Sequence, residues 1–380
     1  MKIIIFLNHS HNMIGRAYKE TESLTRAGHQ VTILARYDNK LQTEEIVGGA
    51  KVLRYIVWPQ TRIPFIKQII FSLRWIRIGL RLDADVYQAS DADTLLEAAV
   101  CAVIKRKKLV YDSYELFLDI ISLQNKKIVR CYWWLKEWIG VRLSDCVIVA
   151  NKERAEVMRR RYQFAKKIEV IENFPNKIII PESIYLENRK VMREKLNISN
   201  KTVFVFQGYL NKNRGLEELA LALPYCKKLQ GTSFLIIGDG DYKSDFEKYV
   251  KQKYNNFIFT GRVDYLKLSQ YLSAGDVGLV FYPPICLNYI YAASNKLYEY
   301  MMNQLIVLSN NIVTICRVLE EERCGLFYSK GSESLAEKID YLVDNSMEIS
   351  KMRQNGFVAA MQKYNWEYQE QKFLNIYEKI

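Results

Sequence analysis

The acidic residue Glu299 stands where its neighbours could build a nucleotide site. It belongs to residues 294–302, Ser-Asn-Lys-Leu-Tyr-Glu-Tyr-Met-Met, where apolar residues recur at helical spacing, and an apolar run of strand length follows at 305–308. This pattern predicts that Glu299 lies at a helix start, just before a buried strand. In open parallel sheets, ligands bind beyond the carboxyl ends of strands, at helix N-termini that favour anions. A carboxylate placed there can accept hydrogen bonds from ribose hydroxyls.

Three further loops of the second half each follow an apolar run of strand length. The first is Gly208-Tyr-Leu-Asn-Lys-Asn-Arg-Gly, which carries Lys212 and Arg214. The others are Gly238-Asp-Gly240 and Gly261-Arg262-Val263. The planar fork of an arginine suits bidentate contact with phosphate. Since the carboxyl ends of parallel strands meet at one edge of a sheet, these loops are predicted to surround one pocket.

The first half places polar residues in comparable positions. A polar loop with Gly15 and Arg16 follows the first predicted strand, and Asp112-Ser-Tyr114-Glu115 follows another. Asp91 also stands after a strand, where it could face a ligand or simply cap the next helix. For Arg16, the alternative is an ordinary exposed arginine at a helix start.

Alternating strands and helices position these groups. Strands are predicted at 2–7, 30–35, 51–57, 86–89, 108–112 and 146–150, then at 203–207, 233–237, 257–260, 277–281 and 305–308. Helical patterns between them predict an α/β fold with parallel sheets and right-handed crossovers. The pattern breaks at 171–199, which predicts two doubly wound, Rossmann-like domains. We expect these parts: 1–175, a linker at 176–200, 201–364, and a last helix at 365–380.

Composition agrees with a folded two-domain protein. The chain has 380 residues, 49% hydrophobic and 26% charged, which is long for one domain and comfortable for two. Its seven cysteines form no Cys-x-x-Cys pair, so neither a zinc site nor a disulfide framework is expected, and the cytoplasm is the expected location. The apolar run after Met1 is too short for a signal sequence and reads as a first strand.

Positive charge is concentrated in the first half. Residues 1–200 hold 34 Lys and Arg against 22 Asp and Glu, which is nearly all of the net +13. In residues 62–82, Lys67, Arg74 and Arg81 recur every seven residues among isoleucines and leucines, and residues 126–142 combine basic residues with three tryptophans. Two interpretations stay open: a core-facing helix with a cationic edge, or contact with an anionic membrane surface. No transmembrane helix and no nucleic-acid partner is expected.

The segment 294–302 resembles the donor-binding element of the GT-B glycosyltransferases, above all glycosyltransferase family 4, whose members show Pro-Asn-Lys-Leu-Phe-Glu-Tyr-Met. The resemblance covers essentially the whole chain, with Tyr291 where a second glutamate is usual and Tyr114 where Asp-x-His-Glu has its histidine. It implies two domains facing each other across a cleft, the first for the acceptor and the second for a nucleotide sugar, with the last helix crossing back to the first domain. It also implies phosphate contacts from Gly15, Arg16 and Arg214, and base contacts from Arg262 and Val263.

On this resemblance, we expect a sugar of hexose type to move from a UDP- or GDP-sugar to an acceptor hydroxyl, with retention of configuration and without a metal or other cofactor. The acceptor would be a lipid-linked or cell-surface polysaccharide precursor, such as one for lipopolysaccharide or capsule, at the inner face of the cytoplasmic membrane. Candidate catalytic residues are Arg214, Glu299, Asp112 and Tyr114. Candidate donor-binding residues are Gly15, Arg16, Gly208, Lys212, Gly238, Gly240, Arg262, Val263, Tyr291, Asn295, Lys296 and Leu297.

Two other functions stay open. A nucleotide-sugar epimerase shares the architecture but is expected to place histidines among acidic residues, and this chain has only His9, His11 and His29. A non-catalytic GT-B subunit is the second, because Tyr114 and Tyr291 replace expected functional residues. The donor sugar, the acceptor, the linkage and the oligomeric state do not follow from the sequence.

Overall fold

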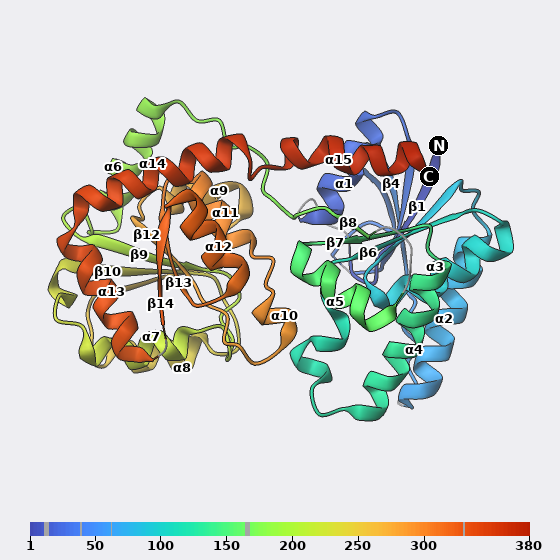
Figure 1. The fold of residues 1–380 in the computed structure, drawn as a ribbon, viewed down its shortest axis with the longest axis horizontal. Helices are drawn as coiled ribbons and strands as arrows, with labels where there is room; N and C mark the ends of the chain where they lie inside the picture. The colour runs from blue at the N-terminus through green and yellow to red at the C-terminus, as the bar shows by residue number, and fades with distance from the viewer. Residues whose placement is uncertain (11–14, 39, 62, 164–167, 330) are drawn as a thin grey trace. The chain divides into compact units, whose positions relative to one another are not determined.

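The computed structural model describes residues 1–10, 15–38, 40–61, 63–163, 168–329 and 331–380 (Figure 1). His11, Arg62 and the middle of the predicted loop before Arg16 lie outside the described residues. The chain divides into two compact units. Unit 1 comprises Met1–Asn173, Cys286–Asn288 and Gln369–Ile380, and unit 2 comprises Phe174–Ile285 and Tyr289–Tyr368.

Unit 1 contains an eight-stranded sheet of order β3-β4-β2-β1-β5-β6-β7-β8. All its strand pairs are parallel except β3 with β4, which are joined through Gly48-Gly49. The strands are β1 Lys2–Phe6, β2 Gln30–Arg36, β3 Glu44–Val47, β4 Ala50–Tyr55, β5 Val86–Ser90, β6 Lys108–Ser113, β7 Cys146–Val149 and β8 Ile168–Val170. The helices are α1 Arg16–Arg26, α2 Pro64–Leu80, α3 Ala92–Lys105, η1 Phe117–Asp119, η2 Ile121–Leu123, α4 Lys127–Leu143 and α5 Lys152–Tyr162.

Unit 2 contains a six-stranded, all-parallel sheet of order β11-β10-β9-β12-β13-β14. Its strands are β9 Thr202–Gln207, β10 Thr232–Ile237, β11 Phe257–Gly261, β12 Val277–Val280, β13 Ile306–Asn310 and β14 Gly325–Tyr328. Its helices are α6 Glu182–Lys195, α7 Leu216–Ala222, η3 Leu223–Tyr225, η4 Leu229–Gly231, α8 Lys243–Lys251, α9 Tyr265–Leu272, α11 Asn295–Met302, α12 Val313–Glu322, α13 Ser332–Asp344 and α14 Ser346–Gln362. The short α10 Leu287–Ile290 and the last helix α15 Trp366–Lys379 belong partly to each unit.

Two separate apolar layers enclose the sheet of unit 2. Along β9, Val203 and Val205 pack into one hydrophobic cluster, whereas Phe204 and Phe206 pack into another. Successive side chains of a strand point to opposite faces, so both faces of this sheet are buried. This burial explains why β9 reads as a continuous apolar run, and the predicted parallel, doubly wound architecture is confirmed.

The predicted strands correspond to observed strands within one or two residues, but β3, β8 and β14 were missed. All three are short edge strands of three or four residues, which keep weak hydrophobic patterns because one side is unpaired. The segment predicted as a linker folds as α6 within unit 2.

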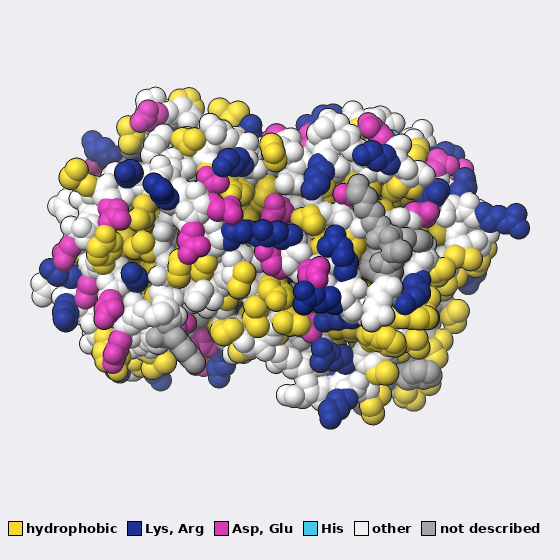
Figure 2. Space-filling view, viewed as in Figure 1, with side chains coloured by type: hydrophobic (Ala, Val, Ile, Leu, Met, Phe, Trp, Pro, Cys, Tyr) yellow, Lys and Arg dark blue, Asp and Glu magenta, His cyan; other side chains and the backbone are white. Residues whose placement is uncertain are grey.

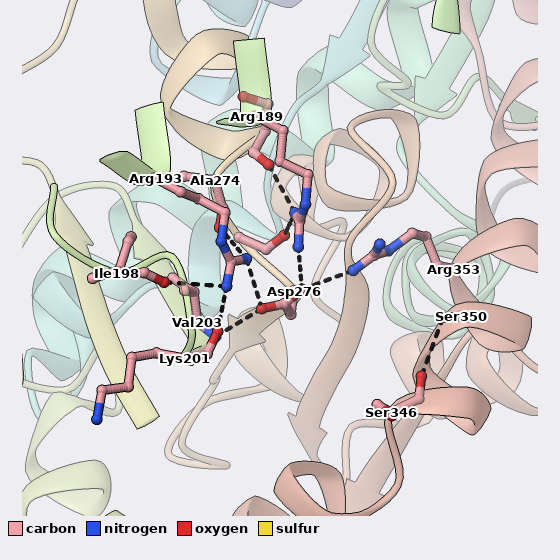
Figure 3. Close-up of polar contacts among 12 residues, drawn as sticks. Arg189, Arg193, Ile198, Lys201, Val203, Ala274, Asp276, Ser346, Ser350 and Arg353 are labelled. Atoms are coloured by element: carbon pink, nitrogen blue, oxygen red, sulfur yellow. Dashed lines mark hydrogen bonds and ion pairs between the residues drawn. The ribbon is translucent and has the colours of Figure 1, made fainter. Parts of the chain in front are cut away.

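A carboxylate at the amino edge of the sheet holds α6 against unit 2 (Figure 3). Asp276, one residue before β12, forms ion pairs with Arg189 of α6 at 2.5 Å, Arg193 of α6 at 3.1 Å and Arg353 of α14 at 2.9 Å, and it accepts a hydrogen bond from the Val203 amide at 2.9 Å. Burial alone would raise the pKa of Asp276, but Arg189 and Arg193 outweigh it and lower this pKa. Asp276 therefore fastens two helices and the first strand of the unit together.

Candidate active site

A pocket of about 1020 Å³ opens at the carboxyl edge of the sheet in unit 2. The chain enters this sheet at β9, continues outward through β10 and β11, and then crosses to β12 on the other side of β9, so β9 and β12 flank the switch point. The lining residues come from the ends of β9, β10, β11 and β12 and from the start of α11. This is the place where doubly wound sheets bind ligands.

Three glycine loops form the floor of the pocket by backbone contact. The Gly208 amide donates to the Ile237 carbonyl and the Gly238 amide donates to the Gly261 carbonyl, both at 2.9 Å. Gly238 has a φ of 140°, and a Cβ there would lie 1.9 Å from the Gly208 carbonyl oxygen. A side chain therefore cannot be accommodated at Gly238 without moving the neighbouring loop.

The Glu299 carboxylate is held at the pocket wall by two neutral donors. Gln207 donates from Nε2 to one carboxylate oxygen, and the Tyr265 hydroxyl donates to the other at 3.3 Å. Both donors line the same pocket as Glu299. Helix α11 begins at Asn295, so Glu299 lies one turn inside it and the prediction that it stands at the helix start was wrong by one turn.

A lysine stands beside this carboxylate at the first turn of α11. The Lys296 Nζ lies 4.3 Å from the centroid of the Phe206 ring, and its Cε and Nζ lie 3.0 and 3.1 Å from the point where a Cβ on Gly208 would stand. Burial, followed by the positive charge of Arg214, lowers the pKa of Lys296 to about 7. The charge of Arg214 therefore acts on Lys296, at the carboxyl end of β9.

The pocket brings together most of the residues predicted for unit 2, namely Gly208, Gly238, Gly240, Arg262, Val263, Asn295, Lys296 and Glu299. Lys212, Arg214, Tyr291 and Leu297 are not among its lining residues. The Arg214 guanidinium lies 5.4 Å from the centroid of the Tyr289 ring, and its Nε is buried without a hydrogen-bond partner among the described residues. Lys212 is exposed, and Leu297 is buried in the hydrophobic core, so the Leu297 side chain is not available to a ligand.

The residues predicted for unit 1 gather around Arg16, the first residue of α1, which follows Gly15 with its φ of 97°. The Arg16 guanidinium donates to Glu20 at 2.7 Å, to both oxygens of Asp112 at 2.8 and 3.1 Å, and to the Ile171 carbonyl at 2.6 Å. Burial would lower the pKa of Arg16, but Asp112 and Glu20 raise it instead. The alternative of an ordinary exposed arginine was wrong, and the predicted phosphate contact of Arg16 stays a prediction.

Tyr114 lies beside this buried ion pair, with the Arg16 guanidinium 5.4 Å from its ring centroid. Its hydroxyl donates to the Ser90 Oγ at 3.2 Å, and burial, then the charges of Glu20 and Asp112, raise the pKa of Tyr114 well above its ordinary value. Tyr114 is therefore a hydrogen-bond donor rather than a base at neutral pH. The catalytic roles of Asp112 and Tyr114 stay predictions.

Asp91 does not cap α3 with its side chain, so that alternative was wrong. Its carboxylate instead accepts hydrogen bonds from the Tyr114 and Glu115 amides, at 3.2 and 3.4 Å. Asp91 has a φ of 71° and a ψ of 167°, a conformation that is costly for any residue with a Cβ. It positions the loop that carries Tyr114.

Sequence reasoning missed several lining residues of unit 2, among them Gln207, Tyr209, Asp239, Asp241, Tyr265 and Tyr282. A signal existed for Gln207, which is a polar residue at the end of an apolar strand and directly before a glycine. Tyr265 follows Asp264, whose carboxylate caps α9 by accepting from the Leu266 amide at 2.9 Å. Among the described residues, no group of three His, Cys, Asp or Glu side chains is placed to hold a metal ion.

Two doubly wound units, one of them with a pocket at its switch point, define a class of fold that known proteins share. Residues 16–176 match the model named Glycosyltransferase Family 4, and residues 188–358 match Glycosyl transferases group 1. An uncharacterised glycosyltransferase of Methanocaldococcus jannaschii is 21% identical over 377 residues, which cover 94% of this chain and 91% of that protein.

Solved structures give the same result for the fold. Anabaena HepE in complex with UDP-glucose has a TM-score of 0.76 and 16% identity, and the match covers all of both chains. WaaG, a glycosyltransferase involved in lipopolysaccharide biosynthesis, has a TM-score of 0.73 and 13% identity, with 97% of this chain and 98% of that chain covered. The chain belongs to the GT-B glycosyltransferases, with the family 4 model matching its first half and the group 1 model its second.

Proposed function

We propose that this protein transfers a hexose-type sugar from a nucleoside-diphosphate sugar to an acceptor hydroxyl, with retention of configuration. The observation that carries the proposal is the pocket at the switch point of unit 2, where Gln207 and Tyr265 hold the Glu299 carboxylate beside Lys296 and the start of α11. A carboxylate with fixed orientation suits a ribose diol, and a helix N-terminus with nearby cations suits a diphosphate. A nucleoside-diphosphate sugar contains both the ribose diol and the diphosphate.

In this proposal, the loops at Gly238, Gly240, Arg262 and Val263 bind the base, and Glu299 binds the ribose. The diphosphate lies at the α11 N-terminus, where Ser294 makes no side-chain cap and the first amides are not satisfied by it. Fixed positive charge and helix amides would stabilise the leaving diphosphate, which is the role a divalent metal plays in other transferases. We therefore propose a reaction that requires neither a metal nor another cofactor.

The donor nucleotide is proposed as UDP, with GDP as the second choice. HepE, a protein of the same fold, has been crystallised with UDP-glucose, with UDP, and with UDP and glucose. Tyr282 lines the pocket and stacks edge-on against Tyr289 at a centroid distance of 5.4 Å. Aromatic faces of this kind pack against the apolar face of a sugar ring, so hexose specificity would depend on this pair.

The acceptor is proposed to be a lipid-linked polysaccharide precursor, as for lipopolysaccharide or capsule, reached at the inner face of the cytoplasmic membrane. The helix α2 buries Phe71 and Trp75 but leaves Ile66, Ile69 and Leu73 exposed, the last of them by 61%. On α4, Ile128 is 88% exposed, and Val129 and Leu135 are exposed as well. A helix that served only the core would bury these residues, and Figure 2 shows hydrophobic side chains with Lys and Arg among them over this part of unit 1.

Basic residues border this apolar surface, as contact with anionic lipid requires. Arg77 on α2 and Arg81, directly after α2, are exposed, and Lys127 and Arg130 are exposed on α4. Lys67 and Arg74 are partly engaged, the first over the Trp58 ring at 5.1 Å and the second with the carbonyls of Ile56 and Val57. Within the residues that the structure describes, no helix is both long and apolar enough to span a bilayer.

Vesicle sedimentation tests the membrane proposal. The protein should sediment with vesicles that contain phosphatidylglycerol and much less with pure phosphatidylcholine, because the basic border needs anionic lipid. Replacing Ile69 and Leu73 by Gln should weaken binding strongly, since each buried side chain contributes about 1.5–3 kcal/mol. Leu221→Gln changes a leucine that is equally exposed, at 61%, but lies in unit 2. Equal loss of binding in both variants would contradict the proposal.

Thermal unfolding in the presence of UDP, GDP, ADP and their common sugar conjugates tests the donor site. One nucleotide class should stabilise the wild type, and Glu299→Ala and Arg214→Ala should remove that effect, whereas Glu321→Ala, at an exposed position, should keep it. A ligand at 100 times its Kd adds about 2.7 kcal/mol to stability. If no nucleotide stabilises the wild type, the chain is better explained as a non-catalytic GT-B subunit. An epimerase would consume a nucleotide sugar without any acceptor.

A further inference from the structure

Lys296 has a setting unlike that of the other pocket residues. Its Nζ lies over the Phe206 ring, 4.3 Å from the ring centroid. Glu299, one turn further along α11, is already engaged by Gln207 and Tyr265. Lys296 is therefore a pocket amine that packs against an aromatic ring.

Lys212, in the loop after β9, was predicted as a donor-binding residue. Tyr209 and Lys212 are both exposed, whereas the amine of Lys296 reaches over Gly208, the residue directly before Tyr209. Lys296 thereby delivers a positive charge to the same end of β9 from another element. Because Gly208 has no side chain, the amine can approach this close.

Positive charge from another loop acts on this amine. Arg214, between β9 and α7, repels the protonated form of Lys296, and Glu299 favours it. The other charged groups that line the pocket come from the loops after β10 and β11, namely Asp239, Asp241 and Arg262. A dianionic phosphate beside Lys296 would offset the repulsion from Arg214 and favour the ammonium form.

We propose that Lys296 is the second phosphate-binding cation of this pocket and that it takes up a proton when a nucleoside diphosphate binds. This inference rests on the proposed nucleotide site and adds to it a residue and a proton. No covalent step is involved: a solvent proton joins the Nζ lone pair, and the ammonium then donates to phosphate oxygens. The released product carries more charge on its terminal phosphate than the sugar-linked donor does, so the protonated lysine favours the leaving group.

Isothermal titration with UDP, in buffers of different ionisation enthalpy, measures the proton directly. From a pKa of about 7, Lys296 is about 0.9 neutral at pH 8, so wild-type binding should take up about 0.9 proton per UDP. Its Kd should rise about eightfold between pH 7.5 and 8.5. Phosphate groups titrate near pH 6 and so contribute little in this range.

Lys296→Met should bind UDP roughly tenfold or more weakly at pH 7, with no proton uptake and a flat pH profile. Lys267→Met, at an exposed site on α9, should behave as wild type. If Lys296→Met does not fold, Lys296→Arg gives a second measurement: an arginine stays protonated across this pH range, so UDP should bind without proton uptake and with a flat pH profile.

Wild-type binding of UDP without proton uptake would refute this inference and leave the nucleotide site intact. So would unchanged uptake in Lys296→Met. Failure of UDP, GDP and ADP alike to bind the wild type would overturn both the inference and the proposed function.

Discussion

Replacing Asp276 by Asn keeps the shape of the side chain and removes its charge. In the wild type, one carboxylate faces three guanidinium groups, from Arg189, Arg193 and Arg353 (Figure 3). The Asp276 side chain is 12% exposed, and those of its partners are between 11% and 21% exposed, so solvent screens the pairs only weakly. The substitution should affect Arg353 most. Arg189 and Arg193 also donate hydrogen bonds to backbone carbonyls, whereas the hydrogen bond given for Arg353 is the one to Asp276.

Removing one partner of a buried ion pair costs about 3–5 kcal/mol. We place Asp276→Asn at the lower end, about 3 kcal/mol, because Arg189 and Arg193 keep carbonyl acceptors at Ser273, Gly275 and Ala274 and the new amide can still accept from Val203. For a unit of this size, such a loss lowers Tm by about 6–12 °C.

Hydrogen exchange followed by mass spectrometry separates the two units, which a single melting curve does not. Amides of β9 and β12 should lose roughly a hundredfold in protection, whereas those of β6 in unit 1 should not change. Asp85→Asn is the matched control. Asp85 also precedes a strand and accepts a hydrogen bond from the Lys2 amide of the first strand at 2.9 Å, but its side chain is 47% exposed and forms an ion pair with Lys107. The Asp85→Asn substitution should lower the free energy of unfolding by less than about 1 kcal/mol. Equal effects of the two substitutions would refute the reasoning.

Two other predictions concern pH and the pocket floor. Because folding lowers the pKa of Asp276, its ion pairs stabilise the protein fully above the ordinary aspartate pKa of 3.8, and this stabilisation is lost as pH falls through the pKa in the folded state. When unfolding is measured at decreasing pH, the difference in stability between the wild type and Asp276→Asn should therefore shrink below about pH 4. Gly238→Ala should abolish nucleotide-induced stabilisation, because the new Cβ would lie 1.9 Å from the Gly208 carbonyl oxygen. Gly28→Ala, with a φ of 86° but no atom within 4 Å of the Cβ position, should cost only about 1 kcal/mol and preserve binding. Retained nucleotide binding in Gly238→Ala would contradict the role given to that loop.

Much of the candidate site follows from residues that are neighbours in sequence. The strand before Gly208, the tight turn at Gly238 and the helical spacing after Asn295 are local patterns, and parallel topology then requires that these ends meet. The same logic predicted the Gly261-Arg-Val loop. Gln207 could have joined this group, since it shares the strand end with Gly208.

Other features required contacts that no local pattern contains. Arg16 reads as a surface residue until Asp112, 96 positions away, pairs with it. Asp91 reads as a helix cap until its carboxylate is seen to hold the Tyr114 loop. The basic heptads of α2 predicted a cationic edge, but the exposure of Ile66, Ile69 and Leu73 depends on which face Phe71 and Trp75 bury.

The sequence alone determined the strand and helix order, the two-unit organisation and the family, because periodicity, turn residues and loop motifs act over a few residues. Tertiary structure decided which charged side chains are buried and which of them pair. Three features depend on distances between side chains far apart in the chain: the ion pairs by which Asp276 holds α6, the pairing of Arg16, and the position of Lys296 at the end of β9. Burial and neighbouring charge set those energies, and both exist only after the sheets have assembled.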